Sequence, residues 1–429
     1  MASLQHTTMN PYKKYKPSGI DWIGEIPNHW QLKKISHGFK KIGSGTTPTS
    51  GNQEYYNEGE FNWLQTGDLT DNEINATSKK ITKKALDDFS TLRFYKPNSL
   101  VIAMYGATIG KTGILNIETT TNQACCVLSE PVFFKSKYVF YWFNANKETV
   151  ISLSYGGGQP NISQEIIKSI RIPCPSLSEQ TTIANYLDEK TTQIDKFITN
   201  KQKLIELLKE ERAAIINEAV SGKGKNWEMK KLKYVASINS SKRNYTFEKN
   251  SDTEVVFLPM EKVSEGGIIN QDTRKKINEV STGFTYFERD DVIVAKITPC
   301  FENGKGALLD NLETDFGFGS TEFHTIKAYD KIEKEFLFFQ TKTDRFMQVG
   351  EAFMTGSAGQ KRVPTNFVQD FEIAVPSIEK QKEIVQHIQT ETQRINNTIS
   401  KIEKEIELMN EYRTALISEV VTGKIKITT

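Results

Sequence analysis

An internal repeat constrains the fold of this 429-residue chain more than any other feature of its sequence. Residues 175–225 align without a gap with residues 376–426, so that EERAAIINEAVSGKGK in the first copy corresponds to EYRTALISEVVTGKIK in the second. The hexapeptide WQLKKI, which begins at Trp30, likewise corresponds to WEMKKL, which begins at Trp227. We therefore expect one unit, a globular head followed by a helical segment, to occur twice.

The repeat also predicts the domain boundaries. We expect a leader, a first head, a first helical segment, a second head, and a second helical segment with a tail at residues 1–29, 30–174, 175–225, 226–375 and 376–429. The helical segments match closely, whereas the heads diverge. A duplicated scaffold with two different heads is typical of a protein that holds one common partner twice and recognises two different ligands.

Both helical segments carry a heptad pattern over about five heptads, which favours a coiled coil over a surface helix. The predicted seam consists of Leu187, Ile194, Ile198, Ile205, Leu208 and Ile215 in the first segment and Ile388, Ile395, Ile399, Ile402, Ile406 and Leu416 in the second. Two matched seams in one chain favour packing of the two helices on each other; the alternative is that each packs only on its own head. Both segments end at Ser/Thr-Gly-Lys, where Gly222 and Gly423 suit a helix stop.

The heads have the pattern of mixed α and β structure, in the α+β class. Short apolar runs such as Leu100–Ala103 and Val292–Ala295 lie beside turns rich in glycine and asparagine, and they predict buried strands. Short helices are expected at residues 137–144 and 334–341.

Composition argues against membrane, secreted and disordered classes of protein. Hydrophobic residues make up 37% and charged residues 25% of the chain. The sequence contains neither an apolar run long enough for a membrane helix nor the apolar segment of a secretory signal at its start. The four cysteines, Cys125, Cys126, Cys174 and Cys300, have no CxxC spacing and indicate free thiols in a reducing, cytoplasmic compartment.

The formal net charge of +2 argues at first against nucleic-acid binding. However, residues 1–174 carry 19 basic and 14 acidic side chains, whereas residues 226–375 carry 20 and 23. Each helical segment is neutral, with 8 of each sign. The average therefore conceals one head of net charge +5 and one of −3, so that only local basic patches could neutralise phosphates.

One segment looks like a catalytic phosphate-binding loop, YGATIGKT from Tyr105 to Thr112. That motif needs a glycine where Tyr105 stands and a helix after the loop, whereas the residues that follow predict a strand. The equivalent segment of the second head, Gly304-Lys305-Gly306, lacks the hydroxyl that would bind magnesium. We interpret the loop as a hairpin that carries a lysine, and we predict no catalytic residues. The histidines and cysteines show no metal-ligand spacing, so no metal site is expected.

Polar loops with planar or basic side chains remain as candidate binding sites. Asparagine, glutamine and arginine can pair with base edges in the major groove of DNA, and lysine can bind phosphates. The candidate DNA-binding residues are Thr46, Thr47, Lys79, Lys80, Tyr105, Thr108, Lys111, Gln159 and Asn161 in the first head and Lys242, Arg243, Asn244, Tyr245, Lys296, Thr298, Lys305, Gln360, Lys361 and Arg362 in the second. Any one of these loops can be an ordinary turn. Their occurrence at equivalent places, as at Gln159 and Gln360, favours a binding function for the set.

Three segments carry a resemblance to a known family. They are YKPSGIDWIGEIPNHW from Tyr15 to Trp30, GQPNIS from Gly158 to Ser163, and IPCPSLSEQ from Ile172 to Gln180. Together with the order of the repeat, they make nearly the whole chain similar to the specificity subunits of type I restriction-modification enzymes. The heads add nothing specific, because this family diverges there.

The resemblance implies that each head is a target recognition domain that reads one half of a bipartite site in double-stranded DNA. It implies that the helices form an antiparallel coiled coil that sets the half-site spacing. It also implies two modification subunits, which methylate adenine with S-adenosylmethionine, and two restriction subunits, the endonuclease and translocase, which use ATP and magnesium. This chain would then bind no cofactor and catalyse no reaction.

The second copy departs from the first at Lys380-Gln381, which replaces Glu179-Gln180, so the two partner contacts need not be identical. Two other functions stay open at this point. One is nucleotide hydrolysis at the Gly110-Lys111 loop, and the other is a scaffold whose heads bind proteins.

Overall fold

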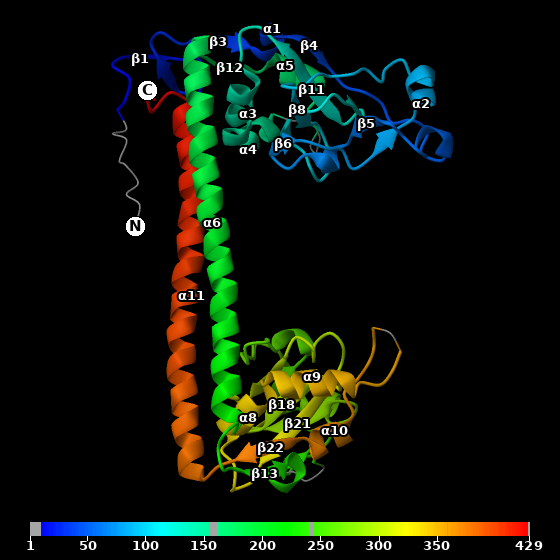
Figure 1. Cartoon of the computed structure of the whole chain (residues 1–429), viewed down its shortest axis with the longest axis vertical. Coiled ribbons are helices and arrows are strands. Elements are labelled where there is room, and N and C mark those ends of the chain that lie inside the picture. Colours follow the sequence, from blue (N-terminus) through cyan, green and yellow to red (C-terminus); the bar gives the residue numbers. More distant parts are fainter. Residues whose placement is uncertain (1–9, 154–160, 241–243, 358, 428–429) are drawn as a thin grey trace. The chain divides into compact units, whose positions relative to one another are not determined.

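The computed structural model describes residues 10–153, 161–240, 244–357 and 359–427 (Figure 1). Its contacts divide the chain into two compact units. The first unit comprises residues 1–200 and 404–429, and the second comprises residues 201–403. Each unit therefore combines one head with part of both long helices, instead of one head with its own complete helix.

The first head contains a five-stranded sheet of order β4-β11-β8-β9-β6, in which all neighbours are antiparallel except β6 and β9. Its strands are β4 (Phe39–Gly43), β6 (Asn72–Ile74), β8 (Leu100–Ala103), β9 (Thr112–Leu115) and β11 (Cys125–Pro131). All four residues of β8 are fully buried, which confirms the strand predicted from this apolar run. A smaller sheet of order β10-β5-β7 comprises β5 (Phe61–Leu64), β7 (Lys80–Ile81) and β10 (Thr120–Thr121).

The second head repeats this plan with four strands in each sheet. The order β14-β21-β18-β19 is antiparallel throughout and comprises β14 (Ala236–Ile238), β18 (Val292–Ala295), β19 (Gly306–Leu308) and β21 (Phe323–Ala328). The order β16-β15-β20-β17 comprises β15 (Glu254–Leu258), β16 (Arg274–Lys276), β17 (Thr285–Glu288) and β20 (Phe316–Gly319). The predicted strand β18 lies in the centre of its sheet and is buried throughout.

Short helices pack beside these sheets. In the first head they are α1 (Ile35–Gly38), α2 (Lys83–Asp88), α3 (Ser136–Ala145), α4 (Lys147–Ser152) and α5 (Gln164–Ser169). In the second head they are α7 (Ile277–Val280), α8 (Lys334–Thr341), α9 (Asp344–Ala352) and α10 (Thr365–Asp370). Helices α3 and α8 confirm the two short helices predicted from the sequence.

The beginning and the end of each head form one two-stranded antiparallel sheet. In the first head, β3 (Gln31–Lys34) pairs with β12 (Arg171–Cys174). In the second head, β13 (Glu228–Lys231) pairs with β22 (Glu372–Val375). The repeated WQLKKI and WEMKKL segments thus form the same strand in both heads, next to the residue where each long helix begins.

The long helices are α6 (Leu177–Val220) and α11 (Ile378–Val421), and they pack side by side (Figure 1). Of the 12 seam residues named above, none is exposed; Ile198, Ile215, Ile399 and Ile406 are half-buried and the other eight are buried. The packing of α6 on α11 is therefore as predicted, and the burial of these side chains agrees with the seam expected from the heptads. The ends of the helices also pack on the heads, since Leu187 and Leu416 both join the core of the first head.

The contacts within each unit show that α6 and α11 are antiparallel. In the second unit, the last turn of α6 at Val220 packs in one core with Ile384, near the start of α11. Earlier in α6, Glu211 accepts from Arg394 at 2.7 Å, farther along α11. In the first unit, Asp195 pairs with Arg413 at 2.9 Å.

Both long helices end as the repeated Ser/Thr-Gly-Lys predicts. Gly222 and Gly423 adopt φ of +65° and +79°, a left-handed conformation that glycine adopts without steric cost. The tryptophan that opens each head packs there. A Cβ on Gly423 would lie 3.0 Å from the ring of Trp30, and one on Gly222 would lie 3.0 Å from the ring of Trp227.

The described part of the leader, residues 10–29, forms part of the core of the first unit. Strands β1 (Tyr15–Pro17) and β2 (Glu25–Pro27) make an antiparallel hairpin, and the side chains of Tyr12, Ile23 and Ile26 are buried in the core of the first head. These leader residues therefore contribute to the packing of the first unit.

Glu179, at the start of α6, binds this leader. Its carboxylate accepts from Tyr12 Oη at 2.7 Å and from Trp30 Nε1 at 3.1 Å. The corresponding residue of the second copy, Lys380, pairs with Glu383 on its own helix at 2.6 Å. The difference between the two copies at this position thus coincides with a leader contact that only Glu179 makes.

Candidate nucleic-acid interface

Two of the predicted loops of the first head lie side by side. Tyr105 and Asn161 form an antiparallel bridge, and Ile162 N donates to Met104 O at 2.8 Å. The loop from Tyr105 to Lys111, which joins β8 to β9, is thereby fixed next to the segment that precedes α5. Asn161 is exposed, and Tyr105, Thr108 and Lys111 are half-buried at the surface. Gln159 lies outside the described residues.

The second head brings the equivalent loops together in the same way. Val363 N donates to Lys296 O at 2.8 Å, and Thr298 N donates to Lys361 O at 3.0 Å. Ile297 and Arg362 form an antiparallel bridge that matches the bridge between Tyr105 and Asn161. We call these paired segments the reading loops: residues 104–111 with 161–162 in the first head, and residues 296–305 with 360–363 in the second.

Backbone contacts confirm the correspondence of the two heads at this place. Ala103 N donates to Lys111 O at 2.8 Å, and Ala295 N donates to Lys305 O at 2.9 Å. Lys111 and Lys305 therefore close the same hairpin, although the second loop is two residues longer. Lys305 is half-buried, and its Nζ donates to Met260 O at 3.4 Å.

A second group of predicted residues in the first head surrounds Trp63. The indole Nε1 of Trp63 donates to Thr46 O at 3.1 Å, and its backbone N donates to Lys79 O at 3.2 Å. Lys79 and Lys80 are exposed. The structure thus brings Thr46 and Lys79 together, although 33 residues separate them in the sequence.

An exposed glutamine that the sequence analysis missed joins this group to the reading loops. Thr47 Oγ1 donates to Gln123 Oε1 at 2.6 Å. The next residue, Ala124, accepts from Met104 N through its carbonyl at 2.8 Å. The signal in the sequence is the polar pair Asn122-Gln123 directly after the strand Thr120–Thr121, which resembles an ordinary turn. Gln123 therefore joins the candidate base-contacting residues.

The remaining predicted residues of the second head lie elsewhere. Lys242 and Arg243 are outside the described residues. Asn244 N donates to Glu288 Oε1 at 2.6 Å, and the ring of Tyr245 lies 5.8 Å from that of Phe316. These contacts are on β17 and β20, whereas Lys296, Thr298 and Lys361 lie on the reading loops.

Arg362 is already engaged within the protein. Its Nε donates to Glu322 Oε2 at 2.9 Å, and its Nη2 donates to Glu322 Oε1 at 2.9 Å. The same carboxylate raises the pKa of the guanidinium. A DNA phosphate at this place would have to compete with Glu322, which fits the negative net charge of the second head. Gln360 and Lys361 beside it are exposed.

In the segment that looks like a phosphate-binding loop, the hydroxyl of Thr112 is hydrogen-bonded within the protein. Thr112 is fully buried, and its Oγ1 donates to Asp71 Oδ1 at 3.1 Å and to Asn144 Oδ1 at 3.0 Å as alternative acceptors. The residues after it form strand β9 and not a helix. The loop therefore lacks the helix N-terminus that binds phosphate in such motifs. Among the described residues, no group of three or more His, Cys, Asp or Glu side chains is placed to hold a metal ion.

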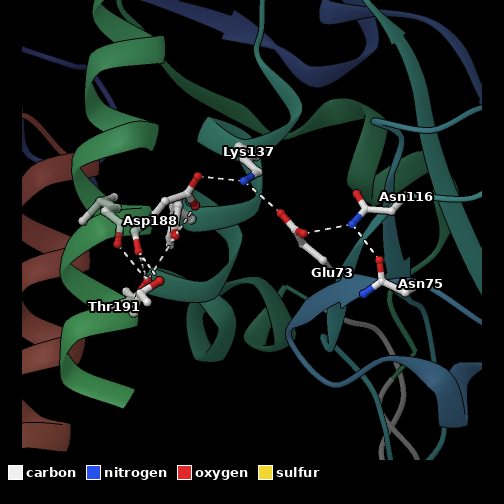
Figure 2. Close-up of polar contacts among 9 residues, drawn as sticks. Glu73, Asn75, Asn116, Lys137, Asp188 and Thr191 are labelled. Carbon is white, nitrogen blue, oxygen red and sulfur yellow. Dashed lines mark hydrogen bonds and ion pairs between the residues drawn. The ribbon is translucent and has the colours of Figure 1, made fainter. Parts of the chain in front are cut away.

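A cleft of about 650 Å³ lies between part of the first head and the paired helices of the same unit, and side chains of both signs line it. Lys137, on α3, joins Glu73 at 2.9 Å to Asp188 on α6 at 2.7 Å (Figure 2). The hydrogen bond from Lys137 lowers the pKa of Glu73. On the other side, Asn116 Nδ2 donates to Glu73 at 2.9 Å. This polar chain ties the sheet edge to α6, and its mixed charge does not suit a phosphate backbone.

Comparison with known proteins gives the family. The profile described as type I restriction modification DNA specificity domain matches the chain twice, at residues 27–210 and 224–408. The chain belongs to this specificity family. Each of the two matched regions of the chain contains one head and most of one long helix, which agrees with the internal repeat.

Curated specificity subunits are similar to this chain over different lengths. The type I restriction enzyme EcoAI specificity subunit of Escherichia coli is 36% identical over 37% of this chain and 27% of its own length. The EcoEI subunit of the same species is 34% identical over 46% of this chain and 32% of its own length. The chain thus spans about a third or less of these two relatives. The MjaVIII specificity subunit of Methanocaldococcus jannaschii is 23% identical over 94% of both chains.

Solved structures of this family share the fold. A chain from a study of complex assembly and conformational transition of the type I R-M system aligns over 93% of this chain and 99% of its own, with a TM-score of 0.69 and 13% identity. The HsdS subunit from Thermoanaerobacter tengcongensis aligns with a TM-score of 0.56 and 13% identity over 93% of this chain. In the described part of this chain, no helix is long and apolar enough to cross a membrane.

Proposed function

We propose that this chain is the DNA-reading specificity subunit of a type I restriction-modification complex and has no active site of its own. Each head acts as a target recognition domain for one half of a bipartite site in double-stranded DNA. The observation that carries the proposal is the pair of reading loops, which have the same backbone contacts in both heads but different side chains. Tyr105 and Asn161 in the first head stand where Ile297 and Arg362 stand in the second. A shared frame with different polar side chains suits the reading of two different base sequences.

The same proposal assigns the partners. Two modification subunits dock on the repeated helices and methylate adenine with S-adenosylmethionine, and two restriction subunits join them and use ATP and magnesium for translocation and cleavage. The repeat supports two equivalent docking sites, because a duplicated surface binds two copies of one partner. Such a complex works on DNA in the cytoplasm.

The direct test measures sequence preference. The full-length chain, assembled with its modification subunits, is bound to a library of DNA duplexes that varies both half-sites and the gap between them. We expect enrichment of one bipartite sequence. Equal binding to all sequences at physiological salt contradicts the proposal, because phosphate contacts alone give affinity without preference.

A second test examines the helices as a ruler between half-sites. One extra heptad is inserted in α6 between Asp195 and Glu211, and one in α11 between Arg394 and Arg413, so that the seam keeps its register. Seven residues at 1.5 Å each lengthen the pair by about 10 Å, or about three base pairs of 3.4 Å. We expect the preferred gap to change by about that amount. An unchanged gap in a folded variant excludes the ruler while leaving half-site reading intact.

A further inference from the structure

One residue at the C-terminal end of the helix behind each pair of reading loops occupies an equivalent position in the two heads: Asn144 in the last turn of α3, and Lys342 directly after α8. The equivalence is set by a buried glutamine on each long helix: Lys135 N donates to Gln180 Oε1 at 2.7 Å, and Glu333 N donates to Gln381 Oε1 at 2.8 Å. Nine residues after Lys135 is Asn144, and nine residues after Glu333 is Lys342.

In the first head, Asn144 holds the end of the reading loop through a side chain. Its Oδ1 accepts from Thr112 Oγ1 at 3.0 Å, and Thr112 directly follows Lys111. Asp71 holds the same residue, because its Oδ1 accepts from Thr112 N at 2.8 Å. Lys147, at the start of α4, donates to the other oxygen of Asp71 at 2.7 Å. The loop end is thus connected to α3 and α4 by uninterrupted polar contacts.

In the second head, Lys342 holds the equivalent loop through backbone carbonyls. Its Nζ donates to Gly304 O at 2.5 Å and to Gly306 O at 3.0 Å, on either side of Lys305. A third bond goes to Glu265 O at 3.0 Å, in the turn after β15. One ammonium group therefore fixes both sides of the loop end and a neighbouring turn. Three donors and three acceptors match in number.

The loop end is held through a side chain in the first head and through backbone carbonyls in the second, and this difference has a steric reason. Gly306 stands where Thr112 stands in the first head, and a Cβ on Gly306 would lie 2.5 Å from Ile293 O. No hydroxyl can therefore be placed there, so a contact through a side chain such as the one at Thr112 is excluded. Only the carbonyl of Gly306 is available, and the longer donor side chain of Lys342 reaches it. The contact between Asn144 and Thr112 in the first head thus corresponds to the contact between Lys342 and Gly306 in the second, and both partners differ.

We infer that Asn144 and Lys342 are positioning residues for half-site recognition, each of which holds the reading loop of its own head from behind and touches no DNA. This inference rests on the proposed function. It adds that the two heads fix the same loop by independent contacts, so that damage to one contact affects the reading of one half-site only.

The first part of the test needs no DNA. Amide hydrogen exchange is measured on the full-length chain carrying Lys342→Met, which keeps the length of the side chain and removes its donors. We expect exchange in residues 300–306 to become at least tenfold faster, with no change in residues 104–112. Asn144→Leu should give the reverse. A variant on the same helix, Lys334→Met, removes an ion pair with Asp290 and serves as the matched control. If exchange in residues 300–306 is unchanged in Lys342→Met, the inference is overturned, independently of any result on DNA binding.

The second part measures base discrimination by the assembled complex at a temperature well below unfolding. The readout is the Kd for sites with one changed base divided by the Kd for the preferred site, a ratio that is large when discrimination is strong. We expect Lys342→Met to lower this ratio about tenfold at one half-site and Asn144→Leu to lower it at the other. A purely structural defect would reduce the binding-competent fraction without changing the ratio. If the wild-type complex shows no base preference, the proposed function fails; if it does and both variants keep its ratios, only the inference fails.

Discussion

Gln180 and Gln381 make the same buried connection between a long helix and its head. Gln180 accepts from Lys135 N at 2.7 Å and donates to Pro175 O at 3.0 Å. Gln381 accepts from Glu333 N at 2.8 Å and donates to Pro376 O at 2.9 Å. Both side chains are fully buried. The glutamine common to the two copies therefore fixes the place where each helix leaves its head.

Replacing either glutamine by leucine should destabilise its unit. Gln381→Leu removes the partners of the half-buried Glu333 N–H and of the buried Pro376 carbonyl, and each buried group left unpaired costs about 1–3 kcal/mol. We expect a loss of roughly 2–5 kcal/mol in the free energy of unfolding, measured by denaturant titration. Gln389→Leu, at an exposed position of the same helix, is the control and should change stability by less than about 0.5 kcal/mol. Equal effects of the two variants would contradict the structural role of Gln381.

Asp291 predicts a pH dependence of stability in the second unit. Its side chain is buried, its Oδ2 accepts from Glu288 N at 2.8 Å, and its Oδ1 has no hydrogen-bond partner among the described residues. Burial raises the pKa of this carboxyl to about 7. Between pH 4 and pH 7 the folded chain therefore holds a proton that the unfolded chain has released, and the free energy of unfolding falls as the pH rises.

The variant Asp291→Asn should remove this dependence. The amide oxygen can still accept from Glu288 N, and no charge is buried at high pH. We expect the wild type to lose roughly 2–4 kcal/mol between pH 4 and pH 7, since each tenfold change in proton affinity is worth about 1.4 kcal/mol. The variant should lose less and should be more stable than the wild type at pH 8. Parallel stability curves for the two proteins would rule out Asp291 as the source.

Lys342 should give a pH dependence of the opposite direction. Burial lowers the pKa of its ammonium to about 8. Between pH 8 and pH 10 the unfolded chain holds a proton that the folded chain has released, so this group makes folding more favourable as the pH rises. Compared with Lys342→Met, the wild type should gain on the order of 1–3 kcal/mol over this range. Thermal unfolding of both proteins at a series of pH values measures the difference.

Gly45 should tolerate no side chain. A Cβ there would lie 1.8 Å from the carbonyl oxygen of Thr121, so Gly45→Ala must displace the loop that carries Thr46 and Thr47. We expect a loss of about 1–3 kcal/mol in unfolding free energy from this overpacking. Gly51→Ala, in the same loop with no atom within 4 Å, is the matched control and should leave the melting temperature unchanged.

Truncation of an aliphatic side chain in α11 should destabilise the protein much more in the seam than on the surface. Ile395 is fully buried in the seam, whereas Leu408 is 51% exposed. Ile395→Ala should cost about 2–5 kcal/mol, because it removes buried methylene groups and leaves a cavity. Leu408→Ala should stay within about 0.5 kcal/mol. Denaturant unfolding followed by the helical signal in circular dichroism compares the two.

The residue pattern of the chain suffices to predict the repeat, the α+β heads, both long helices, their seam and the glycines at their ends. These features depend on patterns among residues that are near each other in the chain, such as apolar side chains at heptad spacing and the left-handed turn at Gly222. The repeat then extends each prediction from the first copy to the second, as it does for the glycines at residues 222 and 423.

Contacts between side chains that are distant in the sequence follow from the fold and not from the residue pattern. Glu179 binds Tyr12 across 167 residues, Arg362 is occupied by Glu322, and Gln123 lies beside Thr47. No local pattern marks these pairs, because each depends on where the folded backbone places two segments. Asn144 and Lys342 are the clearest example of contacts that depend on the folded backbone. They are different residue types at one position, and their common contact with the loop end becomes visible only when the two heads are folded.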